Sequence, residues 1–288
     1  MFTKKLSFPL LLLIIFATSC AKEPAVSEED RQVAEQAAEE YMMAEKIFEN
    51  VFQSVDKNAK QQGDLNGYKT DGSDLETRGG CPSVSFSKAE NGLFPAILEL
   101  DFGTGCTDDG NAVVAGKITA EFTGLLWKEG TTISLSFTDY SYAGYGVTGT
   151  YEIANLGKNA DGQPTYTATV AGQLTKPDGK SFSYISTTTS VQTEGNDTNF
   201  FTNGLSGILD DVWSTTREAS LVTSEGVEVA ITTPNSIQHP FTCIWPVSGA
   251  FSLDINDPDV VGSIDFGNGS CDNKALLTIG DYSVELEL

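Results

Sequence analysis

The stretch LELDFGTGCTDDG (residues 98–110) ends an alternating run, turns on glycines and then reaches a cysteine. The same order returns near the end of the chain as GSIDFGNGSCDNK (residues 262–274). In each copy a strand pattern precedes Asp-Phe-Gly, and another follows the cysteine. Glycine is favoured where the backbone turns sharply. The two stretches therefore predict related strand–turn–strand units near the two ends of a β region.

Between these units the sequence alternates apolar and polar residues with a period of two. Such runs occur at 114–122, 131–137, 145–153, 165–170, 227–231, 247–255 and 282–288. Alternation of this kind is typical of antiparallel strands that bury one face and expose the other. We therefore expect residues 81–288 to form an antiparallel β domain of ten to twelve strands, joined mainly by hairpins.

Glycine also recurs within the strands, in an aliphatic–any–Gly–any–apolar pattern such as VAGKI (114–118) and VSGAF (247–251). A glycine inside a strand usually marks a bend, a bulge or close packing. Six such positions predict a strongly coiled sheet, either a barrel or a wrapped sandwich.

Residues 27–62 have the pattern of a helix. Ser27 and Asp30 resemble a capping box. One apolar stripe steps by three or four through Val33, Ala37, Tyr41, Ala44, Phe48, Val51 and Val55. Residues 63–80 are rich in Gly and Asp and are predicted to be a linker.

The first residues have the pattern of a secretion signal. Lys4 and Lys5 precede a largely apolar run, 6–17, that is too short to span a bilayer. The sequence Ala17-Thr18-Ser19-Cys20 resembles the lipobox of bacterial lipoproteins. That resemblance implies removal of residues 1–19 and acylation of Cys20, with 20–26 as anchor and tether. Two or more acyl chains would hold the protein stably at a membrane.

Four further cysteines follow, namely Cys81, Cys106, Cys243 and Cys271. An even number in an oxidising compartment predicts disulfides, and four cysteines allow three connectivities. We favour Cys81–Cys106 and Cys243–Cys271, each of which closes a short loop. Zinc is the alternative, but it would require short spacings such as C-x-x-C, which the sequence lacks.

Charge and composition exclude several function classes. Without residues 1–19, which hold two lysines and no acid, 15 basic residues face 40 acidic ones. Such a chain repels phosphate backbones, so we do not expect nucleic-acid binding. His239 is the one histidine, and the chain has no G-x-S-x-G motif. We therefore expect neither an enzyme nor a cofactor.

Two clusters are candidate binding sites. Aromatic rings on a polar loop can stack on sugars or partners, which makes Tyr140, Tyr142 and Tyr145 ligand-binding candidates together with Trp127. A second, weaker cluster of oxygen ligands could hold calcium, at Asp254, Asn256, Asp257 and Asp259. The alternatives are a strand role for the tyrosines and a polar turn for the acidic cluster.

The whole chain resembles uncharacterised lipoproteins of the Bacteroidetes. The resemblance is carried by residues 17–20, by DFGTGC (101–106) and by DFGNGSCDNKALLTIG (265–280). It implies an outer-membrane protein anchored by its N-terminal lipid, on either the surface or the periplasmic face. We expect a non-enzymatic binding or structural module whose partner is a glycan or an envelope protein. The alternatives are a carrier of a hydrophobic ligand inside a barrel and a carbohydrate-active hydrolase.

Overall fold

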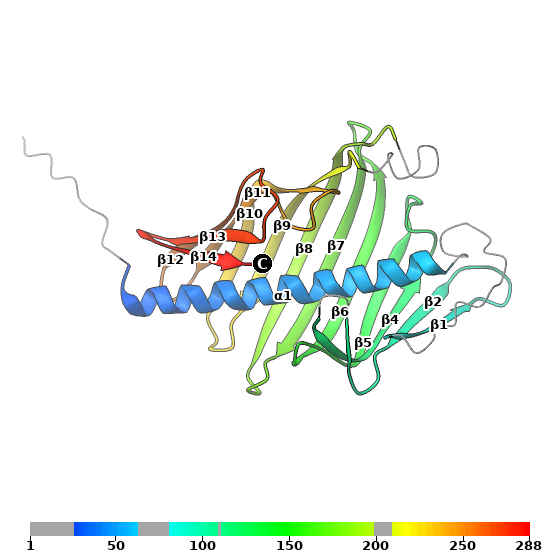
Figure 1. Ribbon diagram of the computed structural model, residues 1–288, viewed down its shortest axis with the longest axis horizontal. Coiled ribbons are helices and arrows are strands. Elements are labelled where there is room, and N and C mark those ends of the chain that lie inside the picture. The colour runs from blue at the N-terminus through cyan, green and yellow to red at the C-terminus, as the bar shows by residue number, and fades with distance from the viewer. Residues whose placement is uncertain (1–25, 63–80, 109–110, 199–208) are drawn as a thin grey trace, which may run out of the picture.

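The structure is a computed structural model that describes residues 26–62, 81–108, 111–198 and 209–288. One long helix, α1 (Glu28–Gln61), precedes a 14-stranded antiparallel sheet (Figure 1). The strands are β1 (Ser83–Lys88), β2 (Ala96–Asp101), β3 (Cys106–Thr107), β4 (Val113–Phe122), β5 (Thr132–Tyr142), β6 (Tyr145–Lys158), β7 (Pro164–Thr175), β8 (Ser181–Glu194), β9 (Val212–Val222), β10 (Glu228–Pro240), β11 (Ser248–Ile255), β12 (Val260–Asn268), β13 (Lys274–Ile279) and β14 (Tyr282–Glu287).

The strands follow one another across the sheet in chain order, with the two-residue β3 set aside as a partner of β4. This meander confirms the expected antiparallel β domain behind one helix. The expected barrel or wrapped sandwich is wrong. Among the described strands, no pairing joins β1 to β14, and all of them belong to one open sheet. The strand number also exceeds the predicted ten to twelve.

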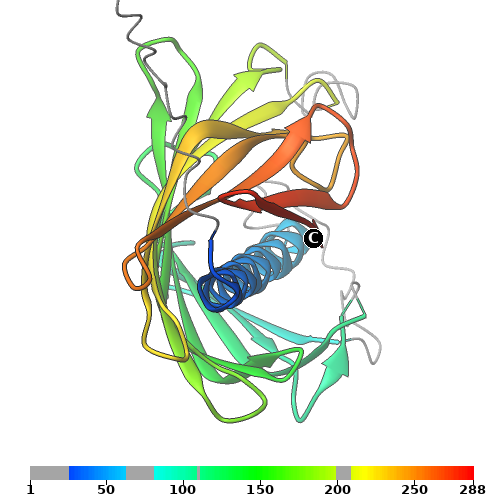
Figure 2. The same cartoon turned by 90° about the vertical axis from the view of Figure 1, so that its left-hand side faces the viewer.

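The physical reason for this correction is that the helix covers the apolar face. α1 lies along the concave side of the sheet, as Figure 2 shows. A sheet needs a second layer to bury its apolar face, and a helix supplies that layer as well as another sheet does. The strand glycines also do more than bend the sheet. Gly172 leaves room for a helix ring, because a Cβ there would lie 2.7 Å from Cζ of Phe48.

The helix begins and packs as its sequence predicts. Ser27 is the N-cap, and its Oγ accepts a hydrogen bond from the backbone N–H of Asp30 at 3.1 Å. Three acidic residues in the first turn interact favourably with the positive end of the helix dipole. The predicted stripe faces the sheet and is buried except at Val33, which is partly exposed. With 34 residues, α1 is about 50 Å long.

Aromatic side chains dominate the contact between helix and sheet. The Tyr41 ring meets Phe251 edge-on, with 5.3 Å between ring centroids. The Phe48 ring lies 5.7 Å from Tyr151 and 6.0 Å from Tyr184. Such pairs add stability beyond the area that they bury.

The two Asp-Phe-Gly stretches form the same local turn. Oδ1 of Asp101 accepts a hydrogen bond from Gly103 N at 2.8 Å, and Oδ1 of Asp265 accepts one from Gly267 N at 2.7 Å. In both stretches the phenylalanine is buried in the core. The carboxylate thus closes the turn while the ring anchors it.

A disulfide lies beside each turn, and the favoured connectivity is confirmed. Cys81 is bonded to Cys106, and Cys243 is bonded to Cys271. The zinc alternative is therefore excluded for these four residues.

Candidate binding site

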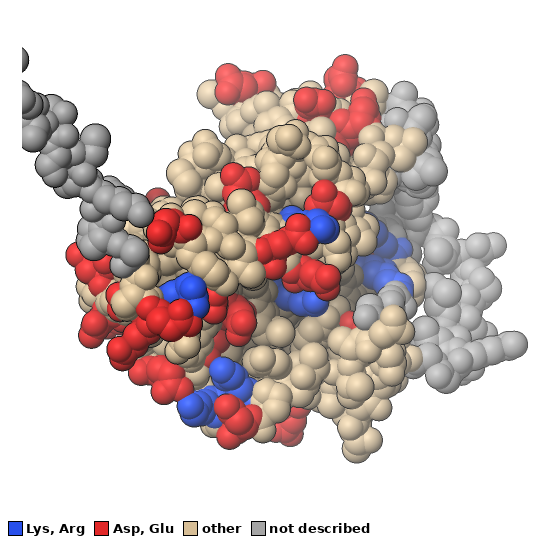
Figure 3. Space-filling view, turned by 60° about the vertical axis from the view of Figure 1, so that its left-hand side comes forward, with Lys and Arg blue, Asp and Glu red and all other residues tan. Residues whose placement is uncertain are grey.

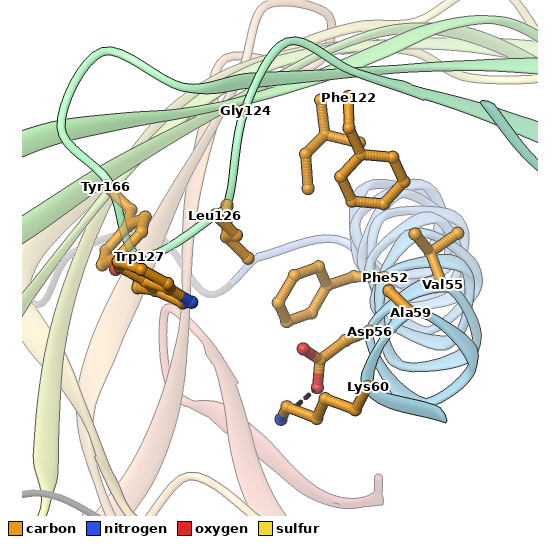
Figure 4. Close-up of a pocket in the computed structure, with 11 residues that line it drawn as sticks. Phe52, Val55, Asp56, Ala59, Lys60, Phe122, Gly124, Leu126, Trp127 and Tyr166 are labelled. Carbon is orange, nitrogen blue, oxygen red and sulfur yellow. Dashed lines mark hydrogen bonds and ion pairs between the residues drawn. The ribbon is translucent and has the colours of Figure 1, made fainter. Parts of the chain in front are cut away.

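A pocket of about 200 Å³ lies beside the C-terminal half of α1 (Figure 4). It opens between the helix and the connection from β4 to β5. Its lining is largely apolar and consists of Phe52, Val55, Asp56, Ala59, Lys60, Phe122, Gly124, Leu126, Trp127, Ile133 and Tyr166. Engineered apolar cavities of about 150 Å³ hold benzene, so this pocket has room for one ring or a short aliphatic group.

The walls of the pocket come from two sides. Figure 4 shows Phe52 reaching from the helix towards Leu126 and Trp127, with Tyr166 behind them and Val55 closer to the helix. Trp127 is 53% exposed, so its indole forms part of the rim and not of the core. A large amphipathic ring that is not buried by its own protein is a common contact for ligands and partners.

A buried amide holds the far wall in place. Nδ2 of Asn155 donates to the carbonyl oxygen of Leu126 at 2.7 Å and to the hydroxyl of Tyr166 at 3.2 Å. Oδ1 of Asn155 accepts from Gly157 N at 2.7 Å. Burial also raises the pKa of Tyr166, so its hydroxyl is neutral at physiological pH. The pocket is therefore preformed on this side.

An ion pair on the last turns of the helix borders the pocket. Nζ of Lys60 lies 2.6 Å from Oδ2 of Asp56, and the lysine side chain is largely exposed. The pocket thus combines an apolar interior with charges at its edge. That combination suits an apolar group attached to a polar one.

A buried polar network fixes the middle of the helix to the sheet. Arg217 on β9 forms an ion pair with Glu45 of α1 and donates to Tyr41 Oη at 3.3 Å. Its Nε donates to Thr188 Oγ1 at 2.8 Å, and Tyr184 donates to Glu45. Burial raises the pKa of Glu45, although Arg217 partly opposes this. Because each group is engaged by a neighbour, the network holds the helix and does not present a free catalytic carboxylate.

The structure corrects the expected tyrosine loop. Tyr140 and Tyr142 are 1% and 5% exposed and belong to the core. The reason is a β-bulge: Asp139 has a φ of 49°, and the β5–β6 register shifts between Ser136 and Ser141. A one-residue slip moves side chains to the opposite face of a strand. Neither buried tyrosine can stack on a ligand.

Tyr145 and Trp127, the other two residues of the predicted aromatic group, are not buried. Tyr145 begins β6 and is partly exposed, at the opposite end of the β5–β6 hairpin from the pocket. Trp127 lies on the pocket rim. The predicted aromatic cluster is therefore divided, and only Trp127 contributes to the pocket.

The candidate calcium ligands lie at the end of one strand and in the turn that follows it. Asp254 belongs to β11, and Asn256, Asp257 and Asp259 lie in or beside the turn to β12. Within the described residues, no three His, Cys, Asp or Glu side chains converge on a point that could hold a metal ion. The turn is polar because it is exposed.

Cys20 and the linker 63–80 lie outside the described residues, so the acylation of Cys20 stays a prediction. No helix in the described part of the chain combines the length and apolar character needed to cross a bilayer.

Acidic side chains are scattered over the face in Figure 3 and outnumber the basic ones. This agrees with the excess of acidic over basic residues in the sequence.

Sequence reasoning missed most of the pocket. Phe52 follows Phe48 by one helical turn at the edge of the apolar stripe, which could have marked a second contact surface. Nothing local indicates that Phe122 and Tyr166, on different strands, meet it.

Comparison with protein-family models, curated proteins and solved structures finds no match to this chain.

Proposed function

We propose that this chain is a non-enzymatic envelope lipoprotein, anchored through Cys20, whose β domain binds the apolar end of a small ligand or partner. The observation that carries the proposal is the aromatic pocket with Trp127 exposed at its rim. Its volume of about 200 Å³ suits one ring or a short acyl end. Ligand pockets for whole drug-sized molecules are larger, about 300–1,000 Å³.

This proposal limits the size of the cargo in the alternative of a hydrophobic-ligand carrier. A barrel carrier needs an interior that is free for its cargo, but here α1 occupies the concave face. Next to the C-terminal half of the helix, the described residues leave space in which a ligand group would fit. We therefore propose partial capture of a group that stays attached to something larger, such as a glycan or an envelope protein.

The test uses the chain from residue 21 onward, which retains every described residue. Single-ring probes, 4-methylphenol and cyclohexanol, are titrated against it, with a methyl glycoside for comparison. Saturable fluorescence change is assigned to Trp127 by its absence from the Trp127→Phe variant. We expect the single-ring probes to bind and the sugar to bind more weakly, because the lining is mostly apolar.

Two helix variants sharpen the result. Ala59 lines the pocket, so Ala59→Leu fills it and should weaken probe binding by at least about tenfold. Lys46 is exposed elsewhere on α1, and Lys46→Leu adds a similar side chain without touching the pocket. Probe binding that Ala59→Leu leaves unchanged, or the absence of saturable binding, would refute the proposal.

A further inference from the structure

A second apolar surface lies on the connection between β10 and β11, residues 241–247, which we call the 241–247 loop. Ile244 is 79% exposed, the highest value among the large apolar side chains of the described residues. Phe241 is 51% exposed, and Trp245 is partly exposed. Residues 240–247, PFTCIWPV, carry no charge. Single exposed apolar residues are ordinary, but several on one uncharged loop indicate an interaction surface.

The loop is held in this exposed conformation. Cys243 is buried and bonded to Cys271. Phe241 N donates to Asp211 O at 2.8 Å, Cys243 N to Pro240 O at 3.0 Å and Val247 N to Gln238 O at 2.9 Å. The disulfide and these hydrogen bonds fix the backbone of the loop at both ends and at Cys243.

We propose that the 241–247 loop inserts its apolar side chains into the interface of a lipid bilayer. The exposure of the loop favours this partner, because exposed apolar side chains can enter the soft surface of a bilayer. The composition agrees, since tryptophan beside aliphatic residues is favoured at membrane–water interfaces. The loop has no lysine or arginine to attract anionic lipid, so insertion is driven by apolar contact.

The length of the tether supports the same partner. Glu28, where α1 begins, follows Cys20 by eight positions, and a fully extended chain of eight steps spans about 29 Å. An acylated Cys20 would thus keep the domain close to the bilayer and raise the local concentration of lipid near the loop. This step rests on the proposed lipidation, whereas the experiment below does not, because it removes Cys20.

The experiment is vesicle flotation with the chain from residue 21 onward. Zwitterionic vesicles of phosphatidylethanolamine and phosphatidylcholine should carry the protein upward. For the variant with Phe241→Ser and Ile244→Ser, the partition coefficient onto vesicles should fall by at least about tenfold. The control combines Val113→Ser and Val261→Ser, two side chains of 59% and 58% exposure on strands, and should float like the parent. Circular dichroism checks that each variant is folded.

Lipid charge gives a second readout. The chain from residue 21 onward has 15 basic and 40 acidic residues, a net charge of −25. Replacing part of the lipid with phosphatidylglycerol should therefore weaken flotation, and salt should restore it. The proposal is overturned if the parent does not float or if the loop variant floats equally well. It is also overturned if sedimentation shows that the loop drives self-association of the parent instead. Ala59→Leu should float normally, which separates this surface from the pocket.

Discussion

Replacing Glu40 tests whether polar contacts hold the helix to the sheet. Glu40 lies on α1 and is 4% exposed. Its carboxylate accepts from Ser224 N at 2.8 Å, from Ser224 Oγ at 2.5 Å and from Lys176 Nζ at 2.9 Å. It therefore joins the helix to the β7–β8 and β9–β10 turns at once.

The expected loss follows from what the substitution leaves behind. Glu40→Leu removes the carboxylate that pairs with the Lys176 ammonium, and the Lys176 side chain is only 22% exposed. It also removes the acceptor of Ser224 N. Removing one partner of a buried pair lowers the free energy of unfolding by about 3–5 kcal/mol. Because Lys176 keeps some exposure, we expect the lower end of that range, about 3 kcal/mol. Lys176→Met should cost about 2 kcal/mol. The double variant should cost about 3 kcal/mol and not about 5, because the two residues are coupled.

The effect should depend on pH. Burial favours a higher pKa for Glu40, but the hydrogen bonds from Ser224 and Lys176 outweigh it, so the pKa lies below its ordinary value of 4.5. A depressed folded pKa means that Glu40 contributes stability above its unfolded pKa and loses it as pH falls through the folded pKa. The difference between parent and Glu40→Leu should shrink from neutral pH to about pH 3.

Urea unfolding followed by circular dichroism measures all four proteins at each pH. Two results would refute the reasoning. The first is additivity of the single variants, which would mean that Glu40 and Lys176 do not interact. The second is a loss for Glu40→Leu that stays constant across the pH range, since that would assign the effect to packing alone.

Two further predictions concern a strand glycine, compared with a turn glycine, and the anchor. Gly116→Ala should cost more than about 4 kcal/mol, because its φ is 78° and a Cβ would lie 2.1 Å from Asp139 O. Gly162→Ala, with a φ of 79° and no atom within 4 Å, should cost only about 1 kcal/mol; equal losses in thermal unfolding would contradict the steric argument. Cys20→Ala should abolish incorporation of labelled palmitate in a bacterial host, and label retained by that variant would disprove acylation at Cys20.

Local patterns account for what could be predicted. The helix and most strands follow from periods of 3.6 and two, which need no knowledge of distant residues. The disulfide pairing was also accessible, because Cys81 and Cys243 each precede their partner by fewer than 30 residues, 25 and 28 in sequence separation. Short loops close at low entropic cost, so neighbouring cysteines were the favoured partners.

The tyrosines show where local patterns fail. DYSYAGYG looks like a polar loop, yet a bulge at Asp139 shifts the alternation and sends Tyr140 and Tyr142 into the core. Period-two reasoning assumes an unbroken ladder, and a single bulge reverses every side chain that follows. The partner strands decide where that bulge forms, and the sequence of the loop alone does not indicate it.

By itself the sequence determined the elements of this protein: one amphipathic helix, a series of antiparallel strands, two stapled turns and a surface rich in acid. Only the tertiary structure decided that the sheet stays open, that α1 fills its concave face, and that Phe52, Trp127 and Tyr166 surround one pocket. The physical reason is range. Periodicity and turn preference act between neighbours along the chain, whereas the choice of the second layer depends on which apolar surfaces meet after the strands have paired.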